Sequence, residues 1–286
     1  MTQTHLKKVR RASLTLNLFT MALIQTLLLS SQPASAFSVD EKSAHNLFAL
    51  SCRNSLNPKT RALAIQQITE AIRLAPKNSL YIYQKAYYLS ISEEDDDEAL
   101  KLLEKVLAVN SKSAESWALK SDILLRHGKA QEALKAADRS TSLNTRFFMT
   151  RLRSLQRLKR REEALAECEK YLKIYPQDAI LLSIHSDLAR QSQKWHIVID
   201  DETKMLALSN PKESSYFTHL KNRAAAYVAT KQDDRAMRDL EEVMKHLRID
   251  RQAPAELLQI YKRKKDAKNI ARIEAYLREL DEDMKP

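Results

Sequence analysis

The sequence predicts an all-α protein, built as a solenoid of six or seven helix-turn-helix repeats. Three observations support this prediction. The 286 residues contain a single glycine, Gly128, whereas the hairpins and bulges of strand-rich folds depend on glycine. Strong helix formers, chiefly Ala, Leu, Lys, Glu and Arg, are abundant. Small residues also recur along most of the chain with a period near 34, which is typical of stacked helical repeats.

The first 36 residues have the pattern of an export signal. A basic stretch is followed by mostly apolar residues 12–29 and then by Ala34-Ser35-Ala36, whose small residues a signal peptidase accepts. We expect cleavage after Ala36, which would leave a helical repeat domain over residues 37–286. An uncleaved membrane anchor and an organelle transit peptide are the alternatives. The basic residues are Lys7, Lys8, Arg10 and Arg11.

From residue 45 onward the chain is periodic. A large apolar residue lies sixteen positions before six of seven small or β-branched residues, which predicts a helix, a turn and a second helix in each repeat. The small residue lets the two backbones approach, and neighbouring hairpins must stack to bury their apolar faces. These predicted anchors of the second helices are Ala64, Ala99, Ala133, Ala164, Val198, Ala236 and Ala271.

This pattern resembles the tetratricopeptide repeat (TPR) family over about residues 45–280. The best unit spans residues 114–145, with Trp117 early, Gly128 in the turn between helices, and Ala133 in the second helix. The last pair, about residues 253–280, is either a seventh repeat or a capping hairpin. The closing prolines of the family appear as Pro76, Pro176 and, one residue late, Pro211.

Two irregularities interrupt the repeat. The step from Ala133 to Ala164 is short, which predicts a shortened junction near Asn144. The step after Val198 is long because of the polar segment 209–215, which we expect to be a loop and the best candidate for an internal hinge.

The resemblance implies a groove lined by the first helices, in which TPR proteins usually hold peptides. In the fourth pair the family's register places Arg146, Arg153 and Arg157 in this groove. The spacing supports that placement, since offsets of 7 and 11 residues put all three within about 40° on one helix face. The hypothesis is that they hold an acidic segment or a terminal carboxylate. The neighbouring repeats would add Arg126, Tyr81 and Tyr88 to the partner-binding groove.

The alternative for these arginines is that they pair with Asp122 and Asp187 on adjacent helices, or are solvated. The acidic run 93–98 is expected to be a solvated turn at the start of a helix, where the helix dipole favours carboxylates. A second basic cluster, residues 262–265, leaves nucleic-acid or other anionic-ligand binding as an alternative function.

No catalytic, cofactor or metal site is predicted. The single glycine excludes P-loops, Rossmann fingerprints and nucleophile elbows. The histidines form no metal-ligand motif, and a calcium loop would need alternating ligands and a glycine turn. Cys52 and Cys168 are far apart and fall on apolar helical positions, so we expect small core residues rather than a disulfide.

The sequence therefore predicts an exported adaptor that binds a partner protein or peptide and is not an enzyme. A self-assembling structural role in the cell envelope is the other main class, because solenoids can stack through uncapped ends. We expect a periplasmic or extracellular location, with a membrane-anchored form only if the signal is not cleaved. The sequence does not identify the partner or the oligomeric state.

Overall fold

The computed structural model describes residues 39–55, 57–92, 95–247 and 250–283. The predicted export signal, residues 1–36, lies outside these ranges. The described residues contain fourteen α-helices, two short 3-10 helices and no strand, as predicted for an all-α solenoid. None of the described helices is both long and apolar enough to cross a membrane.

The helices alternate as first and second members of seven successive pairs. The first helices are α2 (Val39–Ser55), α4 (Ser79–Ser92), α6 (Ala114–Arg126), α8 (Phe148–Arg157), α10 (Ala179–Gln191), α12 (Ser214–Ala229) and α14 (Gln252–Lys264). The second helices are α3 (Arg61–Leu74), α5 (Asp96–Val109), α7 (Ala130–Leu143), α9 (Arg161–Leu172), α11 (Trp195–Leu208), α13 (Asp233–His246) and α15 (Ala267–Asp283). The 3-10 helices η2 (Pro58–Thr60) and η3 (Thr145–Phe147) precede α3 and α8.

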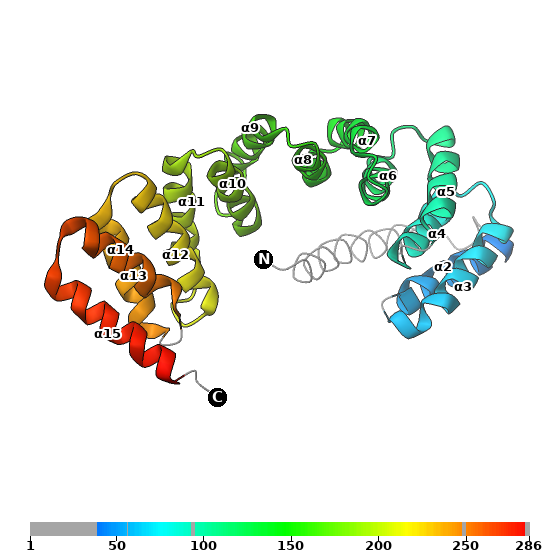
Figure 1. Ribbon diagram of the computed structural model, residues 1–286. Coiled ribbons are helices and arrows are strands. Elements are labelled where there is room, and N and C mark those ends of the chain that lie inside the picture. The colour runs from blue at the N-terminus through cyan, green and yellow to red at the C-terminus, as the bar shows by residue number, and fades with distance from the viewer. Residues whose placement is uncertain (1–38, 56, 93–94, 248–249, 284–286) are drawn as a thin grey trace. The chain divides into compact units, whose positions relative to one another are not determined.

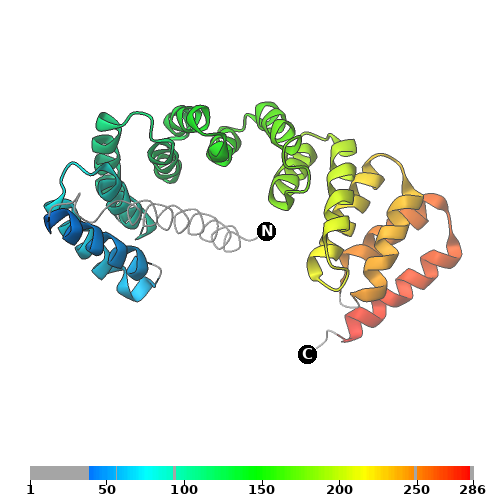
Figure 2. The ribbon, with the colours of Figure 1, turned by 180° about the vertical axis from the view of Figure 1, so that it is seen from behind.

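The chain divides into two compact units, of which the first ends at Leu158 and the second begins at Lys159. In the first unit α2 packs on α3, α4 on α5 and α6 on α7, and α8 follows against α7 (Figure 1). Helix α4 also contacts α6, and α6 contacts α8, so these first helices share one face of the unit. In the second unit α9 packs on α10, and the remaining helices each pack on the next (Figure 2).

Six of the seven predicted anchors are buried, which confirms the repeat over most of the chain. The five alanines from Ala64 to Ala236 are fully buried and Val198 is 1% exposed. The positions four residues further along the second helices are buried as well, since one helical turn brings them to the same face. They are Ile68, Leu103, Ala137, Cys168, Glu202 and Leu240.

The seventh anchor is wrong. Ala271 is exposed, and the buried residue of α15 is Ile273. In α14 the predicted packing residue Ala255 is exposed too, whereas Leu257 and Ile260 are buried. The apolar face of this pair is made by Ala253, Leu257, Ile260, Tyr261 and Ile273, so the residues at the expected spacing are not the ones that pack.

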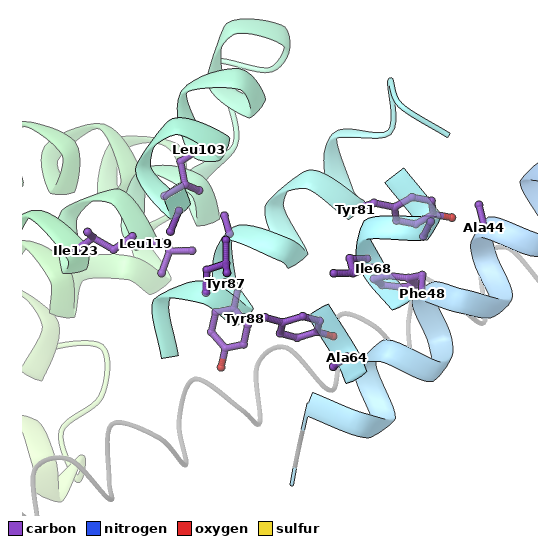
Figure 3. Close-up of a cluster of buried hydrophobic side chains, with 14 residues drawn as sticks. Ala44, Phe48, Ala64, Ile68, Tyr81, Tyr87, Tyr88, Leu103, Leu119 and Ile123 are labelled. Carbon is purple, nitrogen blue, oxygen red and sulfur yellow. The ribbon is translucent and has the colours of Figure 1, made fainter. Parts of the chain in front are cut away.

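The first unit has an aromatic-rich core between α2, α3 and α4. Phe48 of α2 stacks on Tyr81 of α4, with ring centroids 5.2 Å apart, and Ile68 of α3 fills the space beside them (Figure 3). The aromatic side chains of this core pack together with fully buried alanines, among them Ala44 and Ala64. The tyrosines of α4 are therefore part of the packing.

The irregular junctions are where the spacing predicted them. The short step corresponds to η3 and the ten-residue α8. Segment 209–213 is a loop in which the Asn210 side chain accepts a hydrogen bond from Lys212 N at 3.0 Å, while Ser214 and Ser215 already belong to α12. Helices α11 and α12 pack against each other across this loop, and the boundary between units falls at Leu158 instead.

Candidate functional site

The arginines predicted to line a groove do not share one helix face. Arg153 and Arg157 lie one turn apart in α8. Arg146 precedes this helix, in the 3-10 turn η3, where its backbone N–H donates to Asn144 Oδ1 at 3.0 Å. The angle worked out from α-helical spacing therefore applies to Arg153 and Arg157 and not to Arg146.

Arg153 forms the ion pair that the sequence offered as an alternative. Its Nη2 lies 2.8 Å from Oδ1 of Asp122, a carboxylate of α6 that is almost fully buried. The contact is ionic rather than a well-directed hydrogen bond, because neither Asp122 Oδ1 nor the buried Arg153 Nε has a hydrogen-bond partner. The pair links α6 to α8, and the Arg153 side chain remains 31% exposed.

Arg126, at the end of α6, is also engaged. Its Nε donates to Asp96 Oδ2 at 2.9 Å, its Nη2 contacts the other oxygen of the same carboxylate, and Nη2 donates to the carbonyl of Ser90 at 3.1 Å. Asp96 is 4% exposed, and His127 Nε2 lies 3.4 Å from it. The expectation that the whole acidic run is solvated is therefore wrong for Asp96.

Tyr81 and Tyr88 lie in the core, although the family's register placed them in a groove. Tyr81 is 5% exposed and Tyr88 is fully buried, with its hydroxyl 3.3 Å from Ser51 Oγ of α2 (Figure 3). Burial raises the pKa of the Tyr88 hydroxyl. Neither ring offers a surface to a partner.

A contact that recurs between neighbouring repeats explains which charged residues remain available to bind a partner. The last residues of a first helix meet the first residue of the preceding second helix, 30 positions earlier. Arg126 meets Asp96, Gln191 accepts a hydrogen bond from Arg161 Nε at 3.2 Å, and Arg263 meets Asp233 at 2.8 Å.

Arg157 occupies the same place at the end of α8. The preceding second helix, α7, begins with Ala130, which is 27 rather than 30 positions earlier because this step of the repeat is short, and which has no charge to offer. Arg157 is exposed and has no ion-pair partner among the described residues. Of the six predicted groove residues, Arg146 and Arg157 are the two that are exposed.

The second unit contains a buried polar cluster that sequence reasoning missed. Glu202 stands at a position that is apolar in the other repeats, and it accepts hydrogen bonds from Ser186 Oγ at 2.7 Å and Asn222 Nδ2 at 3.2 Å. His219 Nδ1 lies 2.8 Å from its other oxygen. The signal that could have identified it is the charged residue four positions after the anchor Val198.

Beside this cluster, His185 Nδ1 lies 2.7 Å from Asp201 Oδ2, and both residues are buried. Burial raises the pKa of the Asp201 carboxyl, and His185 lowers it in opposition. Cys168 is fully buried, and burial followed by the charges of Asp201 and nearby glutamates raises the pKa of its thiol to about 12. A thiol that stays protonated at neutral pH is not a prepared nucleophile.

The second basic cluster can be compared with the structure. Three of the four cations in the basic cluster 262–265 are paired: Lys262 with Glu274, Arg263 with Asp233 and Lys264 with Asp234. These pairs weaken the argument for an anionic ligand there. In the part of the chain that the structure describes, no three histidine, cysteine or acidic side chains gather as metal ligands.

Known proteins share this arrangement of helices. No protein-family model matches the sequence. Three solved structures are similar at 14% identity: YrrB, described as a TPR protein with an unusual peptide-binding site (TM-score 0.54; 69% of this chain, 97% of that one), a tetratricopeptide repeat protein from Parabacteroides merdae (0.54; 84% and 93%), and PilF of Pseudomonas aeruginosa (0.58; 73% and 94%). The chain has a TPR-like fold.

A curated relative is similar to this chain over only part of its own length. The TPR-like chain is 26% identical over 196 residues to the DnaJ homolog subfamily C member 7 homolog of Schizosaccharomyces pombe. That match covers 62% of this chain and 40% of the relative, so the chain spans less than half the length of that protein. At these identities the structural similarity shows the fold alone, and the activity has to be argued from the residues.

Proposed function

We propose that this TPR-like chain is a protein-interaction scaffold that binds an acidic segment of a partner protein at the α6–α8 face of the first unit. The observation that carries the proposal is Arg157, an exposed arginine at a position where two other repeats have an arginine, Arg126 and Arg263, that pairs with an acid of the preceding second helix. Ala130 stands where those two arginines have Asp96 and Asp233. A partner's carboxylate would supply the charge that the chain itself lacks.

The chemistry of arginine suits this role. A guanidinium binds a carboxylate through two parallel hydrogen bonds, which fixes the orientation of the ligand as well as attracting it. Arg153, one turn earlier in α8, remains partly exposed but is already paired with Asp122, so the proposal rests on Arg157.

The test compares charge reversals in the full chain. Binding of fluorescein-labelled twelve-residue peptides that contain three or more acidic residues is measured by anisotropy, and partners are captured from the native cell extract. Arg157→Glu is expected to weaken binding at least about tenfold, the usual scale for losing one buried charged contact. Arg139→Glu, which makes the same charge change on the exposed side of α7, is the control.

Two outcomes decide the proposal. Equal losses for Arg157→Glu and Arg139→Glu would indicate non-specific attraction to a basic protein and would refute a site on α8. Unchanged capture by Arg157→Glu would refute it as well. Light scattering on the same samples tests self-assembly, since concentration-dependent oligomers that are unaffected by the peptides favour the structural role instead.

We further propose that the protein acts after export across a membrane, with the partner in the periplasm or outside the cell. The proposal rests on the basic, apolar and Ala34-Ser35-Ala36 segments in sequence. N-terminal sequencing of the protein from its native source is expected to begin at Phe37. A protein that still begins at Met1 in a soluble fraction would contradict it.

A further inference from the structure

A second recurring contact holds successive repeats together. One residue near the middle of each of several first helices reaches the second helix of the preceding repeat. Lys120 Nζ lies 3.3 Å from Glu104, Arg151 Nε 2.7 Å from Asp138, and Arg223 Nη1 donates to Thr203 at 3.1 Å. These residues stand thirteen positions before the anchors Ala133, Ala164 and Ala236, and we call this place the joint position.

In α10 the joint position is His185 instead of a permanent cation. It lies thirteen residues before Val198, and its two ring nitrogens face two carboxylates. Nδ1 is 2.7 Å from Asp201 of α11, and Nε2 is 4.0 Å from Glu169 Oε1 of the preceding second helix, α9. Glu169 thus corresponds to Glu104 and Asp138 in the other repeats.

The His185 contact is incomplete in a way that the other joints are not. The His185 side chain is only 7% exposed, and its Nε2 has no hydrogen-bond partner. A neutral imidazole that donates from Nδ1 to Asp201 presents only a lone pair at Nε2. That lone pair cannot bind a carboxylate, so Glu169 stops short of a hydrogen bond.

Protonation changes the contact. An imidazolium donates from both nitrogens, and the half-exposed Glu169 side chain can rotate to accept from Nε2. His185 would then do what Lys120, Arg151 and Arg223 do permanently. Protonation also places a positive charge beside the buried Asp201, which burial otherwise disfavours as an anion.

The other ionisable groups near this joint come from each neighbouring helix. Helix α9 contributes Cys168, whose thiol stays protonated, and Glu167. Helix α11 contributes Asp200 and Lys204, which pair with each other at 2.6 Å and influence Asp201 in opposite directions. Helix α12 contributes His219, which is held by Glu202 and forms a second acid–histidine pair one layer further on.

We propose that His185 makes the α9–α10 joint of the second unit proton-dependent, so that acidification ties α9 to α10 and neutral pH releases it. Histidine is the side chain whose charge changes in the range where cellular compartments differ. The proposal is independent of the α8 site, because all of its residues lie in the second unit.

Hydrogen exchange followed by mass spectrometry on the full chain tests the joint. Exchange of α9 peptides, corrected for the intrinsic pH dependence, is compared at pH 5.5 and 7.5. We expect α9 amides to be protected about tenfold more at the lower pH, as for the gain of one charge-assisted hydrogen bond. Peptides of α13, remote from the joint in sequence, serve as the internal reference.

Three variants test whether the pH dependence of α9 exchange comes from His185 and Glu169. His185→Lys supplies a permanent cation, as in the other repeats, and is expected to abolish the pH dependence. Glu169→Gln alters a half-exposed residue that should not affect folding, and is expected to abolish it too. His219→Gln is the control for the neighbouring pair and should preserve it. A wild-type chain without the pH dependence, or a Glu169→Gln chain that keeps it, would overturn the proposal.

Discussion

Replacing Lys231 with glycine should stabilise the protein, although glycine is less favourable than lysine inside a helix. Lys231 follows α12 with a φ of 59°, in the left-handed region that disfavours side chains. The same conformation recurs after four other first helices, and only one of the five residues is glycine. They are Gly128, Lys159, Gln193, Lys231 and Lys265.

The expected magnitude comes from two opposing effects. A side chain in the left-handed region costs about 1–2 kcal/mol, while the greater freedom of glycine in the unfolded chain costs about 0.5–1 kcal/mol. Lys231 is exposed and its side chain has no ion-pair partner among the described residues, so nothing else is lost. The net gain in the free energy of unfolding should be about 0.5–1 kcal/mol.

Urea denaturation followed by circular dichroism measures this gain, with Lys135→Gly as the matched control. Lys135 is exposed in the interior of α7, where the same substitution should lose about 1 kcal/mol. Because repeat proteins can unfold in parts, exchange of α12 and α13 amides should be measured alongside. If both variants lose stability by similar amounts, the explanation from backbone conformation is wrong.

Three further changes should have defined effects. Gly128→Ala should cost about 1 kcal/mol by urea denaturation, from conformation alone, since an added Cβ meets no atom within 4 Å. Arg126→Ala should cost about 3 kcal/mol because it leaves Asp96 buried with only His127 nearby, and Asp96→Ala in the same chain should recover part of the loss. The pKa of Asp201 is raised in the folded state, so protonation of this carboxyl favours folding. This contribution to the free energy of unfolding is fully present below the pKa of the unfolded state, and it is lost as pH rises through the pKa of the folded state. Asp201→Asn should therefore raise the urea midpoint at pH 7 relative to the wild type and by less at pH 4, and an equal shift at both would contradict the sign.

The sequence predicted the fold well where packing depends on residue size. The anchors from Ala64 to Ala236 are buried because close helix packing requires a small or slim residue at that point, and a fixed period reveals it. The prediction was wrong in the last pair, where Ile273 rather than Ala271 is buried. A terminal repeat packs on one neighbour only, so its residues follow the period less strictly.

The prediction of the site residues was less accurate, because the burial of a residue on a first helix depends on the neighbouring helix. Tyr88 would face outward if α2 were absent, but Ser51 and the rest of that helix cover it. The pairing of Arg126 with Asp96 spans 30 residues and depends on how two repeats stack. The residue pattern of a single repeat cannot show such a contact. A comparison between the last residues of each first helix and the first residue of the preceding second helix can.

The contacts between repeats also change how the net positive charge of the chain should be interpreted. Many of its cations serve the stacking of helices: Arg126 and Arg263 bind the start of a preceding second helix, and Lys120 binds its middle. An exposed arginine at the end of a first helix therefore becomes a candidate for partner binding where the preceding second helix begins without an acid, as Ala130 does for Arg157. By the same argument a residue at a stacking position becomes a candidate for regulation where its charge can change, as it can at His185. Arg157 and His185 are thus both residues whose partner or charge differs from that of the equivalent residues in neighbouring repeats.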